Sequence, residues 1–102
     1  MDETQYLKLV DKALEDAAAW LEEFDPDDVD FATTDGVVTI EFPDGTRYIL
    51  NRQRAANQIW FAAGSEAWHY NWDATKSAWI DDKVGRELFA NMKACVAAKL
   101  GS

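Results

Sequence analysis

The chain has 102 residues, of which 48% are hydrophobic and 13% aromatic, and its formal net charge is −9. This length fits a single domain, residues 1–102, and the composition can form a packed core, which excludes a wholly disordered chain. No apolar run approaches the ~20 residues of a membrane-spanning helix, and the acidic N-terminus has no secretory or mitochondrial leader. We therefore expect a cytoplasmic protein, or one already processed, that does not bind membranes.

The negative charge is concentrated in the first third of the chain. Residues 1–35 contain twelve Asp or Glu against two Lys, a net of −10, whereas residues 36–102 contain seven acids and eight bases, a net of +1. One strongly acidic region beside a balanced body argues against binding of nucleic acid or anionic membranes. It favours cations or basic protein surfaces as partners.

The first predicted element is a helix from Glu3 to Phe24. Asp2 is a good N-cap, and Pro26 disfavours helical geometry at Asp25, so the helix should end near Phe24. Its apolar residues recur at helical spacing and form one continuous arc that should face the core. This arc consists of Tyr6, Leu9, Val10, Ala13, Leu14, Ala17, Trp20, Leu21 and Phe24.

The middle of the chain is typical of short strands separated by turns. The expected strands are Val37–Phe42, Arg47–Arg52, Gln58–Ala63, Ala67–Asp73 and the short Ala78–Asp81, with an optional first strand at Val29–Thr33. Short loops between them favour an antiparallel meander.

A second helix is expected from about Gly85 to Leu100. Its apolar face should contain Leu88, Phe89, Met92, Cys95, Val96 and Leu100. Cys95 is the single cysteine, which excludes an internal disulfide and a thiolate-rich metal site; we interpret it as a buried small apolar residue. The order of elements predicts an α+β two-layer sandwich, with two helices packed on one face of an antiparallel sheet of five to six strands.

This arrangement leaves the other face of the sheet open to water. Strand alternation places mostly polar side chains there, namely Thr39, Glu41, Asn51, Gln58, His69 and Asn71. Trp60 is the one large aromatic side chain on that face. It is either half covered by a neighbouring loop or an anchor for a protein partner, because tryptophan is enriched at interface hot spots. The pattern alone does not decide between these readings.

The segment EEFDPDDVD, Glu22–Asp30, contains six carboxylates in nine positions and no positive charge. On the helix, Glu15 and Glu22 share a face but lie ~10 Å apart along the axis. One ion with ligands at ~2.0–2.6 Å cannot join them, so a ridge of separate weak sites is easier to build than one closed cage. The closest grouping should come from residues 22–30. The candidate metal ligands are Glu15, Glu22, Glu23, Asp25, Asp27, Asp28 and Asp30.

The chemistry of these ligands narrows the choice of ion. All are oxygens, which favours hard cations and disfavours zinc or cuprous copper. An EF-hand is excluded, since a loop starting at Asp25 would have Asp30 in place of the glycine and Gly36 in place of the final glutamate. Nothing supplies the apolar pocket that a catalytic carboxylate pair needs. The alternative to a metal site is a solvated acidic face.

Repulsion among the carboxylates has a cost. Two charges ~6 Å apart in water repel by ~0.7 kcal/mol, so six of them together cost a few kcal/mol, against a domain stability of only ~5–15 kcal/mol. We therefore expect a bound cation or a basic partner to neutralise this segment.

The segment NRQRAANQIW, residues 51–60, makes the chain resemble the frataxin family, in particular its bacterial CyaY proteins. The matching residues are Asn51, Arg52, Gln53, Gln58, Ile59 and Trp60. HYNW (His69–Trp72) is similar to the aromatic strand that follows in the family, and DGTRYILN (residues 44–51) to the hairpin before it. Ala55 departs from the usual proline, and Ala18 and Ala19 stand where close bacterial relatives often have acids.

The resemblance implies a non-enzymatic protein of iron–sulfur cluster biogenesis. Such proteins bind ferrous or ferric iron weakly through carboxylates of the first helix and first strand. They also bind the cysteine desulfurase–scaffold complex and modulate cluster assembly. The implied iron ligands are Glu22, Glu23, Asp25 and Asp30, with Asp27 and Asp28 in the adjoining loop. The implied partner-binding residues are Asn51, Arg52, Gln53, Gln58, Trp60 and His69. We expect a monomer, with metal-dependent self-association as an alternative.

Two rival functions belong to other classes. An acidic mimic of nucleic acid that inhibits a DNA-binding protein explains the charge, but it gives no role to Asn51, Gln58 or Trp60. A ferroxidase or iron-storage enzyme would need Glu-x-x-His pairs on facing helices, and the sequence contains none.

Overall fold

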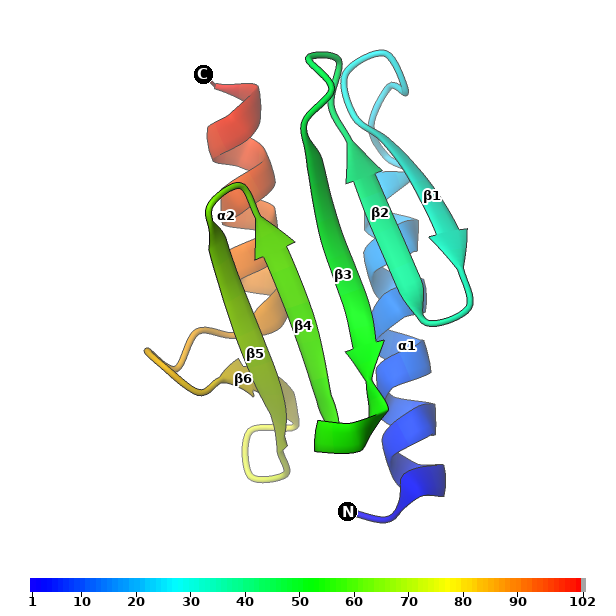
Figure 1. Ribbon diagram of the computed structural model, residues 1–102, viewed down its shortest axis with the longest axis vertical. Helices are drawn as coiled ribbons and strands as arrows, with labels where there is room; N and C mark the ends of the chain where they lie inside the picture. The colour runs from blue at the N-terminus through cyan, green and yellow to red at the C-terminus, as the bar shows by residue number, and fades with distance from the viewer. Residues whose placement is uncertain (102) are drawn as a thin grey trace.

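The computed structural model describes residues 1–101, which form two helices and a six-stranded sheet (Figure 1). The helices are α1 (Glu3–Leu21) and α2 (Leu88–Leu100), and a short 3₁₀ helix, η1, spans Arg54–Ala56. The strands are β1 (Asp30–Thr34), β2 (Val37–Glu41), β3 (Arg47–Gln53), β4 (Gln58–Ala63), β5 (Glu66–Asp73) and β6 (Ala78–Asp81). Each strand pairs antiparallel with the next, in chain order.

Both helices lie on the same face of the sheet, as Figure 1 shows. Helix α1 packs on β1–β3, and α2 packs on β6. The predicted two-layer α+β sandwich is therefore confirmed, and the optional first strand is present as β1. Among residues 1–101, neither helix combines the length and apolar character that crossing a bilayer requires.

The core lies between the two layers and contains the residues that alternation points inward. The buried strand side chains are Val38, Ile40, Tyr48, Leu50, Ile59, Phe61, Trp68, Tyr70 and Trp79, and Phe42, which follows β2, is buried with them. From α1 come Tyr6, Val10, Ala13, Leu14, Ala17 and Leu21, and from α2 Leu88, Met92 and Val96. Cys95 is partly buried against this core, which agrees with the apolar role expected for it.

Helix α1 begins as predicted but ends three residues earlier. The Asp2 carboxylate accepts a hydrogen bond from the Gln5 backbone N–H at 2.8 Å, which caps the first turn. After Leu21 the chain tightens, because the N–H of Phe24 bonds the carbonyl three residues back. Phe24 nevertheless stays on the apolar arc, where its ring packs edge-on against Trp20 at 4.9 Å.

Helix α2 begins at Leu88 instead of Gly85. Gly85 has a φ of +75°, outside the helical region, and the Glu87 carboxylate caps the helix by accepting the N–H groups of Phe89 and Ala90. At the other end, Leu100 is 42% exposed, so it lies outside the packed face that the periodicity assigned to it.

The loop before α2 is organised by a buried carboxylate. Asp81 accepts hydrogen bonds from the backbone N–H groups of Lys83, Val84 and Arg86 at 2.8, 2.9 and 2.5 Å. Burial raises the pKa of Asp81, but these hydrogen bonds outweigh it and the net pKa is lowered. The charged carboxylate therefore fixes the loop that positions the α2 cap.

On the helix-covered side of the sheet, Asn91 and Tyr70 form a buried polar contact. Asn91 Nδ2 donates to the Tyr70 hydroxyl at 2.7 Å, and Asn91 Oδ1 accepts from Arg86 Nη1 at 3.2 Å. Burial raises the pKa of Tyr70, so the phenol stays protonated. The sequence reading missed this contact, because Asn91 stands one position from the apolar arc of its helix.

We predict that Tyr70→Phe lowers the free energy of unfolding by about 1–3 kcal/mol, because it leaves the buried Asn91 donor without an acceptor. The expected fall in melting temperature is roughly 4–8 °C per kcal/mol for a domain of this size. Tyr48→Phe is the matched control, since no hydrogen bond of the Tyr48 hydroxyl is seen within residues 1–101. Equal melting temperatures for the two variants would show that the Tyr70–Asn91 bond contributes nothing.

Candidate functional site

Seven predicted metal ligands form an exposed acidic surface, here called the acidic edge. It consists of Glu15, Glu22, Glu23, Asp25, Asp27, Asp28 and Asp30, and every one of these residues is exposed. Within the part of the chain that the structure describes, none of the seven forms an ion pair with a lysine or arginine. Water, dissolved ions or a binding partner must therefore compensate their charges.

The helical part of the acidic edge borders a groove between α1 and the β1–β2 hairpin. Glu15 and Glu22 line this groove of about 410 Å³ together with Asp11 and Asp35. Ala18 and Ala19 lie between the helical acids, so small side chains occupy the positions where close relatives were expected to have carboxylates. The lining of the groove thus combines four carboxylates with small and apolar side chains.

The loop part of the acidic edge is held by its own backbone. The Asp25 carbonyl accepts from the N–H groups of Asp28 and Val29 at 2.8 and 3.0 Å, and the Asp25 carboxylate accepts from Asp27 N–H at 2.9 Å. Asp25 therefore stabilises the turn with one of its carboxylate oxygens. Asp28 lies at a different hollow, of about 240 Å³, beside Pro43.

Asp30 lies on the opposite face of the sheet from the helices. In β1, Phe31 pairs with the buried Ile40, so its neighbour Asp30 faces outward opposite Glu41. Its carboxylate accepts from the Phe31 N–H at 2.8 Å. Strand alternation thus separates Asp30 from the helical carboxylates.

The acidic edge is therefore spread over a helix, a loop and a strand margin. Among residues 1–101, no group of three or more carboxylate, histidine or cysteine side chains is close enough to hold a metal ion. The expected grouping of residues 22–30 does not form a single site, because the turn after α1 and the alternation of β1 point its members in different directions. The donor set suits separate, largely hydrated cations.

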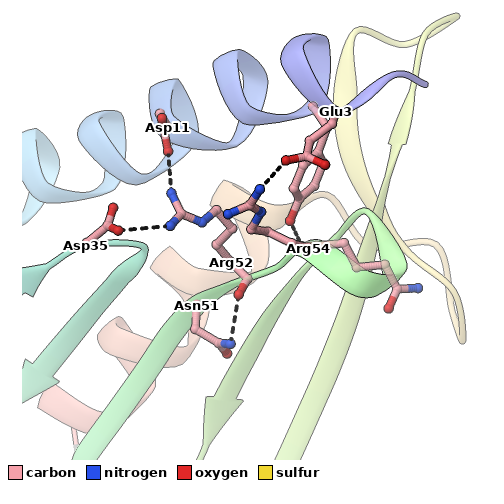
Figure 2. Close-up of polar contacts among 8 residues, drawn as sticks. Glu3, Asp11, Asp35, Asn51, Arg52 and Arg54 are labelled. Carbon is pink, nitrogen blue, oxygen red and sulfur yellow. Dashed lines mark hydrogen bonds and ion pairs between the residues drawn. The ribbon is translucent and has the colours of Figure 1, made fainter.

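Arg52 joins the acidic groove to the sheet, as Figure 2 shows. Its guanidinium donates to Asp11 and to Asp35, each at 3.2 Å, and its side chain is only 15% exposed. Because Leu50 points to the core, Arg52 lies on the same, helix-covered side. Burial lowers the pKa of Arg52, but the two carboxylates raise it by more. Arg52 was expected among the partner-binding residues, and the structure instead places its charge between α1 and the β1–β2 turn.

Gly36 makes room for this bridge. Its φ is +76°, and a Cβ there would meet the Arg52 guanidinium at 3.0 Å. The Gly36 carbonyl also accepts the Arg52 backbone N–H at 2.8 Å. The turn before β2 is therefore matched to Arg52 through both its side chain and its backbone.

A second arginine fixes the segment where the family motif departs from its usual proline. Arg54 forms an ion pair with Glu3 at the start of α1 (Figure 2), and Tyr6 donates its hydroxyl to the Gln58 carbonyl at 2.7 Å. Ala55 lies in η1, between these two attachments. Ion pairing and hydrogen bonding thus hold this connection to α1.

The other candidate residues meet on the uncovered face of the sheet, here called the open face. The register places Asn51, Trp60 and His69 side by side in one row across β3, β4 and β5. Gln53, Gln58 and Asn71 form the next row. The sequence analysis placed all of these except Gln53 outward, and it assigned a partner-binding role to all except Asn71.

Trp60 contacts two side chains of the open face. Its ring stacks on the His69 ring, with centroids 4.2 Å apart and an interplanar angle of 15°. Its Nε1 donates to Gln58 Oε1 at 2.8 Å. His69 on β5 and Gln58 on β4 therefore both contact Trp60 from within the sheet.

The middle of the open face carries no Asp, Glu, Lys or Arg within β2–β6. Its outward residues are Val37, Thr39, Ile49, Asn51, Gln53, Gln58, Trp60, Ala62, Ala67, His69, Asn71, Ala78 and Ile80. Charges occur only at its margins, where Glu41 and Arg47 pair at 3.8 Å and Asp73 ends β5. An aromatic side chain in the centre of an uncharged surface is typical of the core of a protein interface.

Comparison with known proteins gives consistent matches over nearly the whole chain. A family model described as the frataxin-like domain matches residues 1–102. The iron-sulfur cluster assembly protein CyaY of Thioalkalivibrio sulfidiphilus is 39% identical over 92 residues, which cover 89% of this chain and 86% of that protein. The protein of the same name from Vibrio cholerae is 38% identical over 93 residues, covering 91% and 86%.

A solved structure gives the same result for the fold. The frataxin from Psychromonas ingrahamii superposes with a TM-score of 0.87 at 28% sequence identity, and the match covers 97% of this chain and 91% of that one. The arrangement of helices and strands is therefore shared with a protein of known structure.

We predict that Arg52→Gln lowers the free energy of unfolding by about 1–2 kcal/mol, because two charge-assisted hydrogen bonds between α1 and the β1–β2 turn are lost. Arg47→Gln is the matched control, since the exposed Arg47–Glu41 pair should contribute at most ~0.5 kcal/mol. Urea unfolding of both variants measures the difference. If the two variants were equally stable, the Arg52 bridge would not differ from an ordinary surface ion pair.

We also predict that salt stabilises the protein. Raising the NaCl concentration from about 0.01 M to about 1 M shortens the Debye length from ~30 to ~3 Å. This screens the acidic edge and should raise the melting temperature by roughly 5 °C or more, as should millimolar divalent cations. The variant Asp27→Asn/Asp28→Asn should melt higher at low salt and respond less to salt.

Asp35→Asn is the control for this prediction, because the same chemical change removes an acid that Arg52 binds and should lower the melting temperature. A melting temperature of the unaltered protein that responds to neither salt nor divalent cations would contradict the repulsion argument.

Proposed function

The chain belongs to the frataxin family, and on this premise we propose that it is an iron–sulfur cluster assembly protein with two binding surfaces. The acidic edge binds ferrous or ferric iron weakly, and the open face docks on the cysteine desulfurase–scaffold complex. Frataxins are non-enzymatic, so the protein acts by binding and not by catalysis. We place this activity in the cytoplasm, with the protein acting as a monomer.

The donor chemistry of the acidic edge supports weak iron binding. Its ligands are exposed oxygens that have no in-chain cation as partner among the described residues, and iron ions accept such ligands. With no three donors gathered within residues 1–101, each ion would keep most of its water ligands. Binding of this kind is weak and readily reversible, which suits delivery of iron better than storage.

The open face supports docking of a protein partner. The observation that carries this part of the proposal is the stack of Trp60 on His69 in the middle of an uncharged sheet surface, on a chain with a net charge of −9. Such a face has little electrostatic desolvation to overcome when a partner covers it. The acidic edge then steers the approach toward a basic patch of the partner.

Iron and docking are linked through charge in this proposal. An iron ion on the acidic edge reduces its negative charge, which weakens attraction to a basic partner surface. Iron level would thereby change the affinity for the desulfurase. Equal desulfurase affinities of iron-loaded and iron-free protein would remove this link but leave docking itself intact.

We predict that Trp60→Ala lowers affinity for the desulfurase–scaffold complex by about 30-fold or more, as expected for an aromatic hot spot worth ≥ ~2 kcal/mol. The fold and the iron titration should be unchanged, because Trp60 lies outside the core and away from α1. Calorimetric titration with the complex, and separately with ferrous iron under anaerobic conditions, measures both.

Val84→Ala is the control for the docking experiment, since it removes an exposed apolar side chain (67% exposed) outside the sheet. Full affinity of Trp60→Ala would overturn docking through the open face. It would favour the alternative of an acidic nucleic-acid mimic, in which the acidic edge alone binds a basic protein.

A further inference from the structure

Three side chains of the open face form a chain of hydrogen bonds. Trp60 Nε1 donates to Gln58 Oε1 at 2.8 Å, and Gln58 Nε2 donates to Asn71 Oδ1 at 3.2 Å. Gln58 and Asn71 stand opposite each other in the β4–β5 register, so the second bond crosses between strands. The chain thus connects the indole edge of Trp60 to β5.

The direction of donation along these hydrogen bonds is fixed by the chemistry of Trp60, the first member. An indole N–H can only donate, so Gln58 must turn its oxygen toward Trp60. Its NH₂ group then points to the neighbouring strand, where Asn71 must present its oxygen. Both halves of the Gln58 amide are therefore used within the protein, although the sequence analysis expected Gln58 to contact a partner.

These bonds complete the restraint of the Trp60 ring. His69 supports one face of the ring at 4.2 Å, and Gln58 holds its polar edge. A side chain that is already fixed in one rotamer loses less conformational freedom when a partner covers it, so association is stronger for the same contacts. Asn71 is exposed and is the last member of this series of hydrogen bonds, where it accepts from Gln58 Nε2.

We infer that Asn71 is a positioning residue of the docking surface, which acts through Gln58 to hold the Trp60 indole flat on His69. The inference rests on the proposed function, since it assumes that Trp60 contacts the partner. Asn71 acts on the partner through the orientation of Trp60 and not by direct contact.

The first test uses the free protein and needs no partner. Trp60→Phe identifies the indole N–H resonance of Trp60 in a nitrogen–proton NMR spectrum. We expect exchange of this proton with water to become several-fold faster in Gln58→Ala and in Asn71→Ala. Asn51→Ala is the matched control. The Asn51 amide donates to the Arg52 carbonyl and takes no part in the hydrogen bonds that link Trp60, Gln58 and Asn71. Unchanged exchange in Asn71→Ala would overturn the inference.

The second test is a double-mutant cycle on affinity for the desulfurase–scaffold complex. Asn71→Ala should weaken binding about three- to tenfold in the unaltered protein. In the Trp60→Phe background, where no indole N–H can reach Gln58, the same change should have less than about a twofold effect. An undiminished effect there would mean that Asn71 contacts the partner directly, and the positioning role would be wrong.

The two tests separate this inference from the proposed function. If Trp60→Ala left affinity unchanged, docking through the open face would fail, whatever the indole exchange showed. If Trp60→Ala abolished binding while Asn71→Ala changed neither exchange nor affinity, only the positioning role would fail. Melting temperatures of all variants check that the exposed substitutions leave the fold intact.

Discussion

The register of a single antiparallel sheet, covered by helices on one face only, decides where each strand side chain acts. Successive residues point to opposite faces, and a slip of one residue would exchange them all. Leu50, Asn51 and Arg52 show the result in three consecutive positions. Leu50 lies in the core, Asn51 lies on the open face beside Trp60, and Arg52 reaches the carboxylates of the groove under α1.

The same register separates two kinds of surface that act over different distances. The acidic edge has charges without an ion-pair partner in residues 1–101, and their influence extends ~8–10 Å at physiological ionic strength. The middle of the open face has none and acts only where atoms touch. Arg52 lies on the helix-covered side of the sheet, beside the groove that the acidic edge borders. By neutralising Asp11 and Asp35, it keeps part of the acidic groove from repelling itself, and it attaches the sheet to α1 at the same point.

Local patterns predicted most of the fold, because helix periodicity, strand alternation and the Asp2 cap are properties of neighbouring residues. Phe24 shows the limit of this reading: its apolar spacing continued after the backbone had left the helix at Leu21, since spacing reports burial and not hydrogen bonding. The roles of Arg52 and Asn71 depend on partners 41 and 13 residues away. Such pairings depend on how α1 packs on the sheet and how the strands align in space, which patterns among neighbouring residues do not show.

Strand β1 ends the sheet, and no strand among the described residues pairs with its outer side. An unpaired strand edge offers hydrogen bonds to any other chain in extended conformation, and natural proteins commonly guard such edges with charge. Here Asp30 begins the strand and Asp35 follows it. If the acidic edge binds cations as proposed, its carboxylates would also keep a second molecule from adding to the sheet, and we expect a cation that neutralises Asp30 to weaken that barrier to self-association.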